Sequence, residues 1–206
     1  MRRFVCLSHT GIASGAWPLN DLPGAAGRVD VLCRNVQAAL FLSHGLRADV
    51  EVYLAFHGPP ARVVCIQGSA IQRLQPDERS TAARIQQALQ AAWDVPDWKD
   101  VQPGLRVAAY TFAELLDELA PHGRLVLLDP EGAPVEGFAW PEDPVLLLSD
   151  HVPFAPQEYA ELERRGVLRV SLGRQWYHGN HAIAVVQHAL DRQAERSGAE
   201  APVAVR

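Results

Sequence analysis

The chain has 206 residues, of which 48% are hydrophobic, so it is long and apolar enough for one medium domain with a full core. The apolar run near its start, Phe4–Leu7, is far too short for a secretory signal or a membrane span, and we expect no membrane partner. The three cysteines lie in apolar surroundings, which favours buried thiols in a reducing cytoplasm over a disulfide framework.

The net charge of −5 by itself argues against nucleic-acid binding, but the charge is unevenly distributed. Residues 1–92 hold nine basic and six acidic side chains, whereas residues 93–206 hold ten basic and eighteen acidic ones. This asymmetry favours a polyanionic partner on the first part. Eighteen of the nineteen basic residues are arginines, whose guanidinium groups suit bidentate phosphate contacts, although a GC-rich genome would also enrich arginine.

The first predicted elements are a strand at Phe4–Leu7 and a loop rich in glycine and proline from Gly11 to Gly27. From Arg28 to a stop at Gly45 we predict a helix, because apolar residues recur at the spacing of one helical face. The residues of this apolar stripe are Val29, Leu32, Cys33, Val36 and Leu40.

A second strand is predicted at Val50–Leu54, and Asp77 is a typical N-cap for a second helix. We expect this helix to run through Arg84, Ile85, Leu89 and Trp93. The following segment, Asp94–Pro103, contains two prolines, so we expect a connection there and the best candidate for a boundary within the chain.

The second half contains three continuous apolar runs, Leu125–Leu128, Val145–Leu148 and Val167–Val170, which predict strands buried on both faces of a parallel sheet. Helical patterns accompany them at Phe112–Leu119, Pro156–Arg165 and His178–Arg192. Ligands bind outside the carboxyl ends of such strands. We therefore expect one pocket formed by the three loops that follow the runs, which are Asp129–Gly132, Ser149–His151 and Ser171–Gly173.

Segments spread from Phe4 to about Arg192 share the pattern of one known family. They are Leu22–Arg34, Phe41–Arg47, Val64–Ile66, Gln75–Arg79, Pro144–His151, Val170–Gly173 and His178–His181. Together they resemble the tRNA pseudouridine N1-methyltransferases first described in archaea. That family belongs to the knotted SPOUT class of RNA methyltransferases, which use S-adenosylmethionine.

The resemblance implies an α/β fold with a SPOUT-type parallel sheet, a C-terminal trefoil knot and an N-terminal extension. It implies one domain over residues 1–206, with an RNA-side part (1–93), a knotted cofactor-binding part (104–195) and a flexible tail (196–206). The cofactor-binding residues that it implies for S-adenosylmethionine are Leu128, Ser149, Leu172, Gly173, Arg174, Gln175, Trp176, Tyr177 and Ala182. Two of them depart from the archaeal pattern, since Ser149 replaces a glycine and Ala182 a cysteine.

Asp30 and Arg34 lie four residues apart on the first predicted helix, off its apolar stripe. The resemblance places both near the target base and makes them the catalytic candidates. Methylation at N1 of pseudouridine requires the N1 proton to be removed or strongly hydrogen-bonded, which a carboxylate can do, while an arginine can hold a phosphate or an imide oxygen. The alternative is a surface ion pair between residues i and i+4, worth a few tenths of a kcal/mol.

The RNA-binding candidates are Arg28, Arg34 and Arg79, and Asp77–Arg79 also form a typical helix start. The resemblance implies a homodimer in the cytoplasm that acts on the T-loop of a tRNA, whereas a bacterial member would leave another tRNA or an rRNA open as the substrate. We expect the dimer contact on the last helix, whose apolar positions exceed what one sheet face should need; they are Ile183, Val186, Ala189 and Leu190. The abundance of alanine, proline and arginine suggests a bacterial member.

Two alternatives have other chemistry. One is an RNA-binding relative that has lost cofactor use, which the changes at Ser149 and Ala182 make conceivable. The other is a metal-dependent hydrolase built on Asp150, His178 and His181. The spacing His-x-x-His lacks a further ligand in a recognised order, so we expect no metal.

Overall fold

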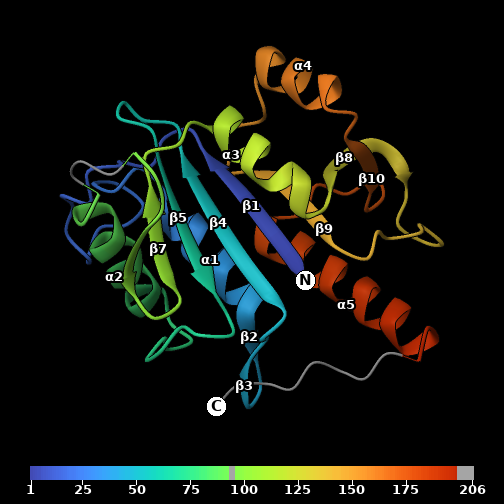
Figure 1. Cartoon of the computed structure of the whole chain (residues 1–206), viewed down its shortest axis with the longest axis horizontal. Helices are drawn as coiled ribbons and strands as arrows, with labels where there is room; N and C mark the ends of the chain where they lie inside the picture. Colours follow the sequence, from blue (N-terminus) through green and yellow to red (C-terminus); the bar gives the residue numbers. More distant parts are fainter. Residues whose placement is uncertain (93–95, 199–206) are drawn as a thin grey trace.

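The computed structural model describes residues 1–92 and 96–198, and within these ranges eight strands form one mixed sheet in the order β10-β8-β9-β1-β4-β5-β7-β6 (Figure 1). The strands are β1 (Arg2–Ser8), β4 (Val50–Phe56), β5 (Arg62–Gln67), β6 (Lys99–Gln102), β7 (Leu105–Ala108), β8 (Arg124–Pro134), β9 (Pro144–Ser149) and β10 (Leu168–Ser171). A separate small ribbon pairs β2 (Phe41–Leu42) with β3 (Gly45–Leu46).

The first five strands of this order are parallel to one another, and β5, β7 and β6 continue the sheet in antiparallel pairs. The carboxyl ends of β10, β8, β9, β1 and β4 therefore lie along one edge, which we call the carboxyl edge. Strand β1 comes from the start of the chain but lies between β9 and β4. The three apolar runs of the second half are confirmed as parallel strands.

Helices cover both faces of the sheet. They are α1 (Val29–Leu40), α2 (Glu78–Gln90), α3 (Phe112–Leu119), α4 (Pro156–Arg164) and α5 (Gly179–Arg196), with a 3-10 turn η1 (Ala120–His122) after α3. Helices α1, α2 and α5 pack on one face, and α3 and α4 pack on the other, so that α3 passes in front of the sheet in Figure 1 while α1 lies behind it.

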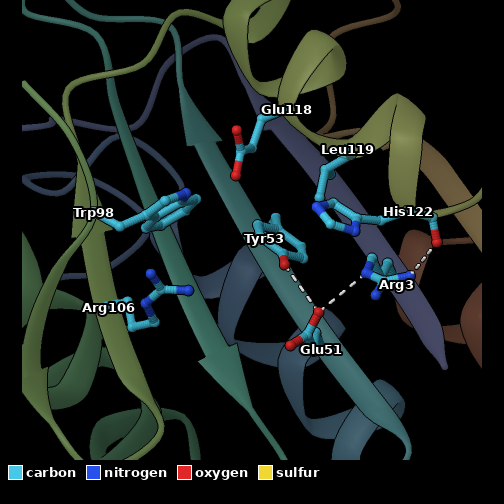
Figure 2. A pocket seen from close by; sticks show the side chains of 8 residues that line it. All are labelled: Arg3, Glu51, Tyr53, Trp98, Arg106, Glu118, Leu119 and His122. Carbon is cyan, nitrogen blue, oxygen red and sulfur yellow. Dashed lines mark hydrogen bonds and ion pairs between the residues drawn. The ribbon is translucent and has the colours of Figure 1, made fainter.

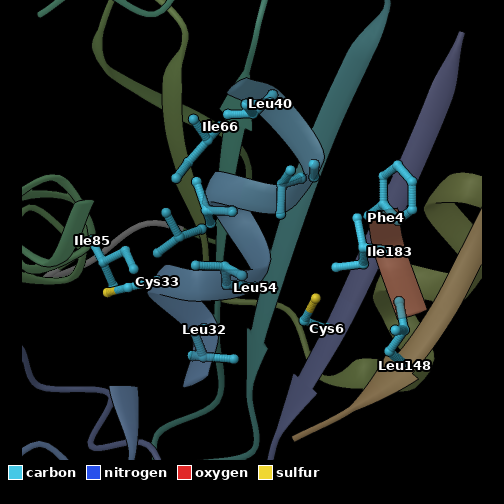
Figure 3. Close-up of a cluster of buried hydrophobic side chains, with 14 of the residues drawn as sticks. Phe4, Cys6, Leu32, Cys33, Leu40, Leu54, Ile66, Ile85, Leu148 and Ile183 are labelled. Atoms are coloured by element: carbon cyan, nitrogen blue, oxygen red, sulfur yellow. The ribbon is translucent and has the colours of Figure 1, made fainter. Parts of the chain in front are cut away.

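The core follows from the alternation of side chains along β1. Phe4 and Cys6 point towards α1 and α5, whereas Val5 and Leu7 join the cluster under α3. Figure 3 shows the first cluster, with Leu32 and Cys33 of α1 among the buried side chains. Because β1 is buried on both faces, it reads as a continuous apolar run. All three cysteines are buried free thiols.

The structure differs from the sequence prediction at the end of the first helix. We expected the helix to stop at Gly45, but α1 ends at Leu40, and Phe41 is already extended. The amide of Arg47 donates to the carbonyl oxygen of Leu40 (2.8 Å), which closes the β2–β3 ribbon directly after the helix. The predicted glycine stop is thus part of the ribbon.

The segment Asp94–Pro103 is only partly a connection, because it contains β6, which pairs with β7. Helix α2 ends at Gln90 and is therefore shorter than predicted. Trp93, the predicted end, lies outside the described residues, as do Asp94 and residues 199–206 of the predicted tail. Helix α2 itself begins as predicted, since the carboxylate of Asp77 accepts a hydrogen bond from the amide of Ser80 (2.8 Å).

The last helix uses its apolar face inside the protomer. We expected an excess of apolar residues on α5 to form a dimer contact, but Ile183, Val186 and Leu190 are buried against the sheet and α1, and Ala189 packs beside them. This sequence argument for the dimer contact was wrong, because α5 covers α1 as well as the sheet and needs a wider apolar face.

Candidate functional site

Three strand ends that were predicted to form a pocket do meet on the carboxyl edge. Ser149 is the last residue of β9 and pairs with Leu7 of β1. The pairing of β8 with β10 shifts from Arg169 with Leu127 to Val170 with Ala133, so residues 128–132 of β8 are not paired with β10. Gly132 lies so close to β10 that a Cβ atom would be 2.5 Å from the Arg169 carbonyl carbon. The β8 loop and the end of β10 are therefore in tight backbone contact.

The segment that follows β10 is presented to solvent. Gly173 has a positive φ of 100°, a conformation that favours glycine. Its amide donates a hydrogen bond to Oγ of Ser171 (3.1 Å). Trp176 is 85% exposed and Tyr177 is also exposed, whereas Ala182 is buried in the first turn of α5. This large exposed indole in the segment after β10 is available to stack on a planar ligand.

The two catalytic candidates, Asp30 and Arg34, are in direct contact at the start of α1. The Asp30 carboxylate is 4% exposed and accepts a hydrogen bond from Nη2 of Arg34 (2.7 Å) and two from Arg28, through Nε (3.0 Å) and Nη2 (3.2 Å). Arg34 also donates to Glu78 of α2 (3.0 Å). Asp30 is therefore not the exposed surface pair of the alternative reading.

The loop before α1 holds this cluster in place through its backbone. Gly27 has a φ of 68°, and a Cβ atom there would lie 1.9 Å from the carbonyl oxygen of Thr10. Arg28, the N-cap of α1, is also left-handed with a φ of 65°, a conformation that costs a non-glycine residue about 1 kcal/mol or more. Thr10 donates from Oγ1 to the Gly27 carbonyl oxygen (2.9 Å). The end of β1 and the start of α1 are thus joined.

The electrostatics of Asp30 limit what it can do. Burial favours the neutral acid, but the hydrogen bonds from Arg28 and Arg34 outweigh it, so the pKa of Asp30 is lowered below its ordinary value. A carboxylate with a lowered pKa is a weak base that remains charged at neutral pH. Arg79, the third RNA-binding candidate, is exposed in the first turn of α2, beside the Glu78 that pairs with Arg34.

A polar cluster that the sequence analysis missed joins the ends of β1 and β9. The Asp150 side chain is 1% exposed and accepts hydrogen bonds from the amides of His9 and Val152 (2.8 Å each) and from Oγ of Ser8 (3.3 Å). The ring of His9 lies between Asp150 (Nδ1, 3.2 Å) and Glu158 of α4 (Nε2, 3.0 Å). His9 and Asp150 each directly follow a buried strand, and this position was the available signal.

A hollow of about 180 Å³ lies away from the carboxyl edge, near the amino ends of β1 and β4 (Figure 2). Its lining residues are Arg3, Glu51, Tyr53, Trp98, Arg106, Glu118, Leu119 and His122. Glu51 accepts hydrogen bonds from both Arg3 (3.1 Å) and Tyr53 (2.9 Å), so these polar groups satisfy one another. The hollow is also smaller than the usual pocket for a ligand of cofactor size, about 300 Å³ or more.

Two further features bear on the alternatives. Within residues 1–92 and 96–198, no group of three or more His, Cys, Asp or Glu side chains is placed to hold a metal ion. The set Asp150, His178 and His181 of the hydrolase alternative is thus not assembled, and Asp150 is engaged by His9. In the same residues, no helix combines the length and apolar character of a membrane span.

Comparisons with known proteins match nearly the whole chain. Residues 1–195 match a family model described as putative SAM-dependent RNA methyltransferase. A tRNA (pseudouridine(54)-N(1))-methyltransferase of Haloarcula marismortui is 43% identical over 195 residues, which cover 93% of this chain and 96% of that protein. The protein of the same name from Methanocella arvoryzae is 39% identical, with 94% and 100% covered. Both relatives are archaeal, which gives no support to the bacterial origin suggested by the composition.

A solved structure shares the fold. The crystal structure of Archaeoglobus fulgidus Nep1 bound to S-adenosylhomocysteine is similar with a TM-score of 0.62 over 92% of this chain and 96% of that chain. Its sequence identity is 14%, so this likeness concerns the fold alone. It confirms the α/β fold of SPOUT type that the resemblance implied.

Proposed function

The chain belongs to the family of putative SAM-dependent RNA methyltransferases, and from this premise we propose that it methylates N1 of a pseudouridine in tRNA. The observation that carries the proposal is the identity of 39–43% to two tRNA (pseudouridine(54)-N(1))-methyltransferases over nearly the full length of each protein. Position 54 of tRNA is accordingly the proposed target. A tRNA-modifying enzyme acts in the cytoplasm, where we place it.

The cofactor site that we propose lies on the carboxyl edge. Its residues are Leu128, Ser149, Leu172, Gly173, Arg174, Gln175, Trp176, Tyr177 and Ala182. The arrangement fits the cofactor, because Leu128 and Leu172 provide partly buried apolar side chains and Trp176 provides an exposed aromatic ring in the segment after β10. When bound, S-adenosylmethionine supplies a methyl group activated by its sulfonium. Ser149 adds a side chain at the strand end but is itself only partly buried.

The proposed catalytic pair is Asp30 and Arg34. The N1–H of the target base would donate to Asp30, and Arg34 would hold an imide oxygen or the neighbouring phosphate. Both oxygens of Asp30 already accept from arginines, so the base must displace or share one of these contacts. The weak basicity of Asp30 favours a role in orienting and polarising the N1–H over its full removal before methyl transfer.

The proposed RNA surface contains Arg28, Arg34 and Arg79, which lie at the starts of α1 and α2. Each phosphate contact that is removed should lower the salt slope of tRNA binding by roughly one unit. The triple alanine variant is the test, and Arg164→Ala on the outer side of α4, where Arg164 pairs with Glu161, is the matched control. Equal salt slopes for the two variants would move the RNA surface elsewhere.

We also propose a trefoil knot and a homodimer. The close contact of the β8 loop with β10, together with the hydrogen bond from the Val135 amide to the Ser171 carbonyl oxygen (2.9 Å), supports threading of this region. We place the dimer contact on the outward face of α5, where Val185 is exposed. Light scattering at micromolar protein tests this assignment, and Val185→Glu should shift the mass towards the monomer.

The experiment that tests the function uses two tRNA transcripts that differ only at position 54, one carrying pseudouridine and the other uridine. Incubation with S-adenosylmethionine, digestion and nucleoside mass spectrometry should show N1-methylpseudouridine from the first transcript alone. Methylation of both transcripts would overturn the base specificity. Cofactor binding without methylation of either would favour the alternative of a non-catalytic RNA-binding relative.

A further inference from the structure

The ring of His9 is held between two carboxylates at the point where the two halves of the chain meet. Nδ1 lies 3.2 Å from Oδ1 of Asp150, and Nε2 lies 3.0 Å from Oε2 of Glu158. The three residues come from the end of β1, the end of β9 and the first turn of α4. Both carboxylates are largely buried, and the His9 side chain is mostly covered as well.

This geometry demands a doubly protonated ring. A neutral imidazole has one N–H and one lone pair, so it can donate to only one of two carboxylates. The second carboxylate would then face the lone pair at about 3 Å, which is repulsive, and two buried anions would lack a cation between them. When both carboxylates are ionised, only the imidazolium satisfies both contacts.

The contacts of Asp150 connect this ring to the proposed cofactor site. Asp150 directly follows Ser149, and its amide donates to the carbonyl oxygen of Leu7 (2.8 Å). Its carboxylate accepts from the amides of His9 and Val152, which defines the turn after β9. A change in the charge balance at Asp150 therefore acts on the backbone of the loop that holds Ser149.

We propose that His9, as an imidazolium clasped by Asp150 and Glu158, is a positioning residue that makes binding of the cofactor depend on protonation of the protein. The inference rests on the proposed function, because it assumes that the cofactor binds at the Ser149 loop. His9 itself does not touch the reacting atoms. Loss of its proton weakens the contacts that connect the ends of β1 and β9 with α4, and it thereby lowers the affinity for the cofactor.

Three other ionisable groups lie around the clasp, by which we mean the contacts of His9 with Asp150 and Glu158. His57, at the end of β4, stacks on His9 with ring centroids 6.0 Å apart, and its Nδ1 lies 3.6 Å from Glu158. Nδ1 of His151 lies 3.9 Å from Oδ1 of Asp150. The hydrogen bonds with Asp30 raise the pKa of Arg28, and the negative charge of Asp150 also contributes to raising it. His57 and His151 are much more exposed than His9, so they do not replace the buried contact.

Burial favours the neutral form of His9, but the hydrogen bonds with Glu158 and Asp150 outweigh it and raise the pKa of His9 above its ordinary value. A group whose folded pKa is raised contributes its full stability below the unfolded value, near pH 6.5, and loses it as the pH rises through the folded value. The contacts of the His9 ring with both carboxylates are therefore fully formed at and below about pH 6.5 and are lost as the pH rises through the raised pKa of His9.

The experiment is calorimetric titration with S-adenosylhomocysteine from about pH 6 to about pH 9. This ligand lacks the sulfonium charge, so long-range attraction to the freed carboxylates does not mask the effect. The wild type is compared with His9→Gln, because the difference between the two profiles removes the titration of the amino group of the ligand. His44→Gln, in the exposed turn between β2 and β3, is the matched control.

We expect the wild type to bind about tenfold more tightly than His9→Gln at pH 6, and this ratio to fall towards one at pH 9. His57→Gln and His44→Gln should keep the wild-type profile. Parallel profiles for wild type and His9→Gln would overturn the coupling, and so would a profile flattened by His57→Gln alone. Absence of binding at every pH would overturn the proposed cofactor and the coupling with it.

A second readout needs no ligand. The melting temperature of the wild type should exceed that of His9→Gln most at pH 6 and below, and the difference should shrink as the pH rises. A difference that stays constant from pH 6 to about pH 9 would show that His9 does not carry the titrating proton, and it would overturn the clasp itself.

Discussion

The two ends of strand β1 carry charged clusters of different kinds. At the amino end, Arg2 donates to Gln187 and Asp191 of α5 (2.6 Å each), and Arg47 forms two hydrogen bonds with Asp191 (2.9 and 2.7 Å). The cations of these contacts are arginines, which keep their charge at any physiological pH. The arginine contacts at this end therefore join α5 to the sheet throughout the neutral pH range.

At the carboxyl end, Ser8 and His9 meet Asp150 and Glu158, and the Thr10 loop meets the start of α1. Here a titratable ring replaces arginine, the backbone is left-handed at Gly27 and Arg28, and the nearby loop after β10 is exposed. In our proposal, the same strand contributes to stability at its amino end and to cofactor binding at its carboxyl end. Strain and exposure gather at the end where a ligand would supply the missing contacts.

We expect the largest effect from a change in the backbone at the carboxyl end of β1. Gly27→Ala should reduce the free energy of unfolding by at least about 3 kcal/mol, because its Cβ meets the Thr10 carbonyl oxygen at 1.9 Å. Gly137→Ala is the control, since Gly137 has a similar φ of 80° but open space around it, and should cost about 1 kcal/mol. Chemical denaturation that gives equal costs would show that the Thr10 contact does not tie the two elements.

The chemistry at the carboxyl end is tested next by Asp30→Asn. Single-turnover methylation of pseudouridine-containing tRNA should slow by about a hundredfold, the usual worth of a group that manages a proton. Stability should fall by about 1–2 kcal/mol, because the buried carboxylate of Asp30 loses charge-assisted hydrogen bonds.

Glu78→Gln is the matched control for Asp30→Asn. It removes the second partner of Arg34 and leaves the Asp30 contacts intact, so its rate should stay within a few-fold of wild type. If Asp30→Asn instead weakens tRNA binding as much as it slows methylation, Asp30 serves mainly to orient the two arginines.

A substitution at the amino end of β1 should affect stability and leave methylation unchanged. Asp191→Asn removes an acceptor shared by Arg2 and Arg47 and should cost about 2 kcal/mol at neutral pH, or about 4–8 °C in melting temperature, with methylation unchanged at lower temperature. Burial opposes ionisation of Asp191, but the arginine hydrogen bonds outweigh it and lower its pKa. The cost should thus be present above the ordinary pKa near 3.8 and disappear as the pH falls below it. A cost that persists at low pH would contradict this assignment.

The smallest expected effect is that of Trp176→Ala. The indole is almost fully exposed, so unfolding should change by less than about 0.5 kcal/mol, while affinity for S-adenosylhomocysteine should fall by roughly three- to tenfold through lost stacking. Trp98→Ala, in the hollow near the amino ends, should do the reverse and lower stability without affecting the cofactor. Unchanged affinity in Trp176→Ala would remove this ring from the site.

Much of the local structure was determined by the sequence alone. Helices α2 and α3, the buried strands β8, β9 and β10, and the shared edge of their loops follow from apolar periodicity and from the Asp77 cap, because these signals depend on neighbours in the chain. The family resemblance added the cofactor, the substrate class and the candidate residues. It could not show how Asp30 is paired or whether it is buried.

Only the tertiary structure decided which distant residues meet. The insertion of β1 between β9 and β4 brings His9 to Asp150, which lies 141 positions away in the chain, and no local pattern encodes such a contact. The same holds for Asp30, which is buried and paired with two arginines, and for α5, whose apolar face packs against α1 and the sheet. Strand order and helix facing are set by the burial of the whole core, so these features emerge only when the complete chain packs.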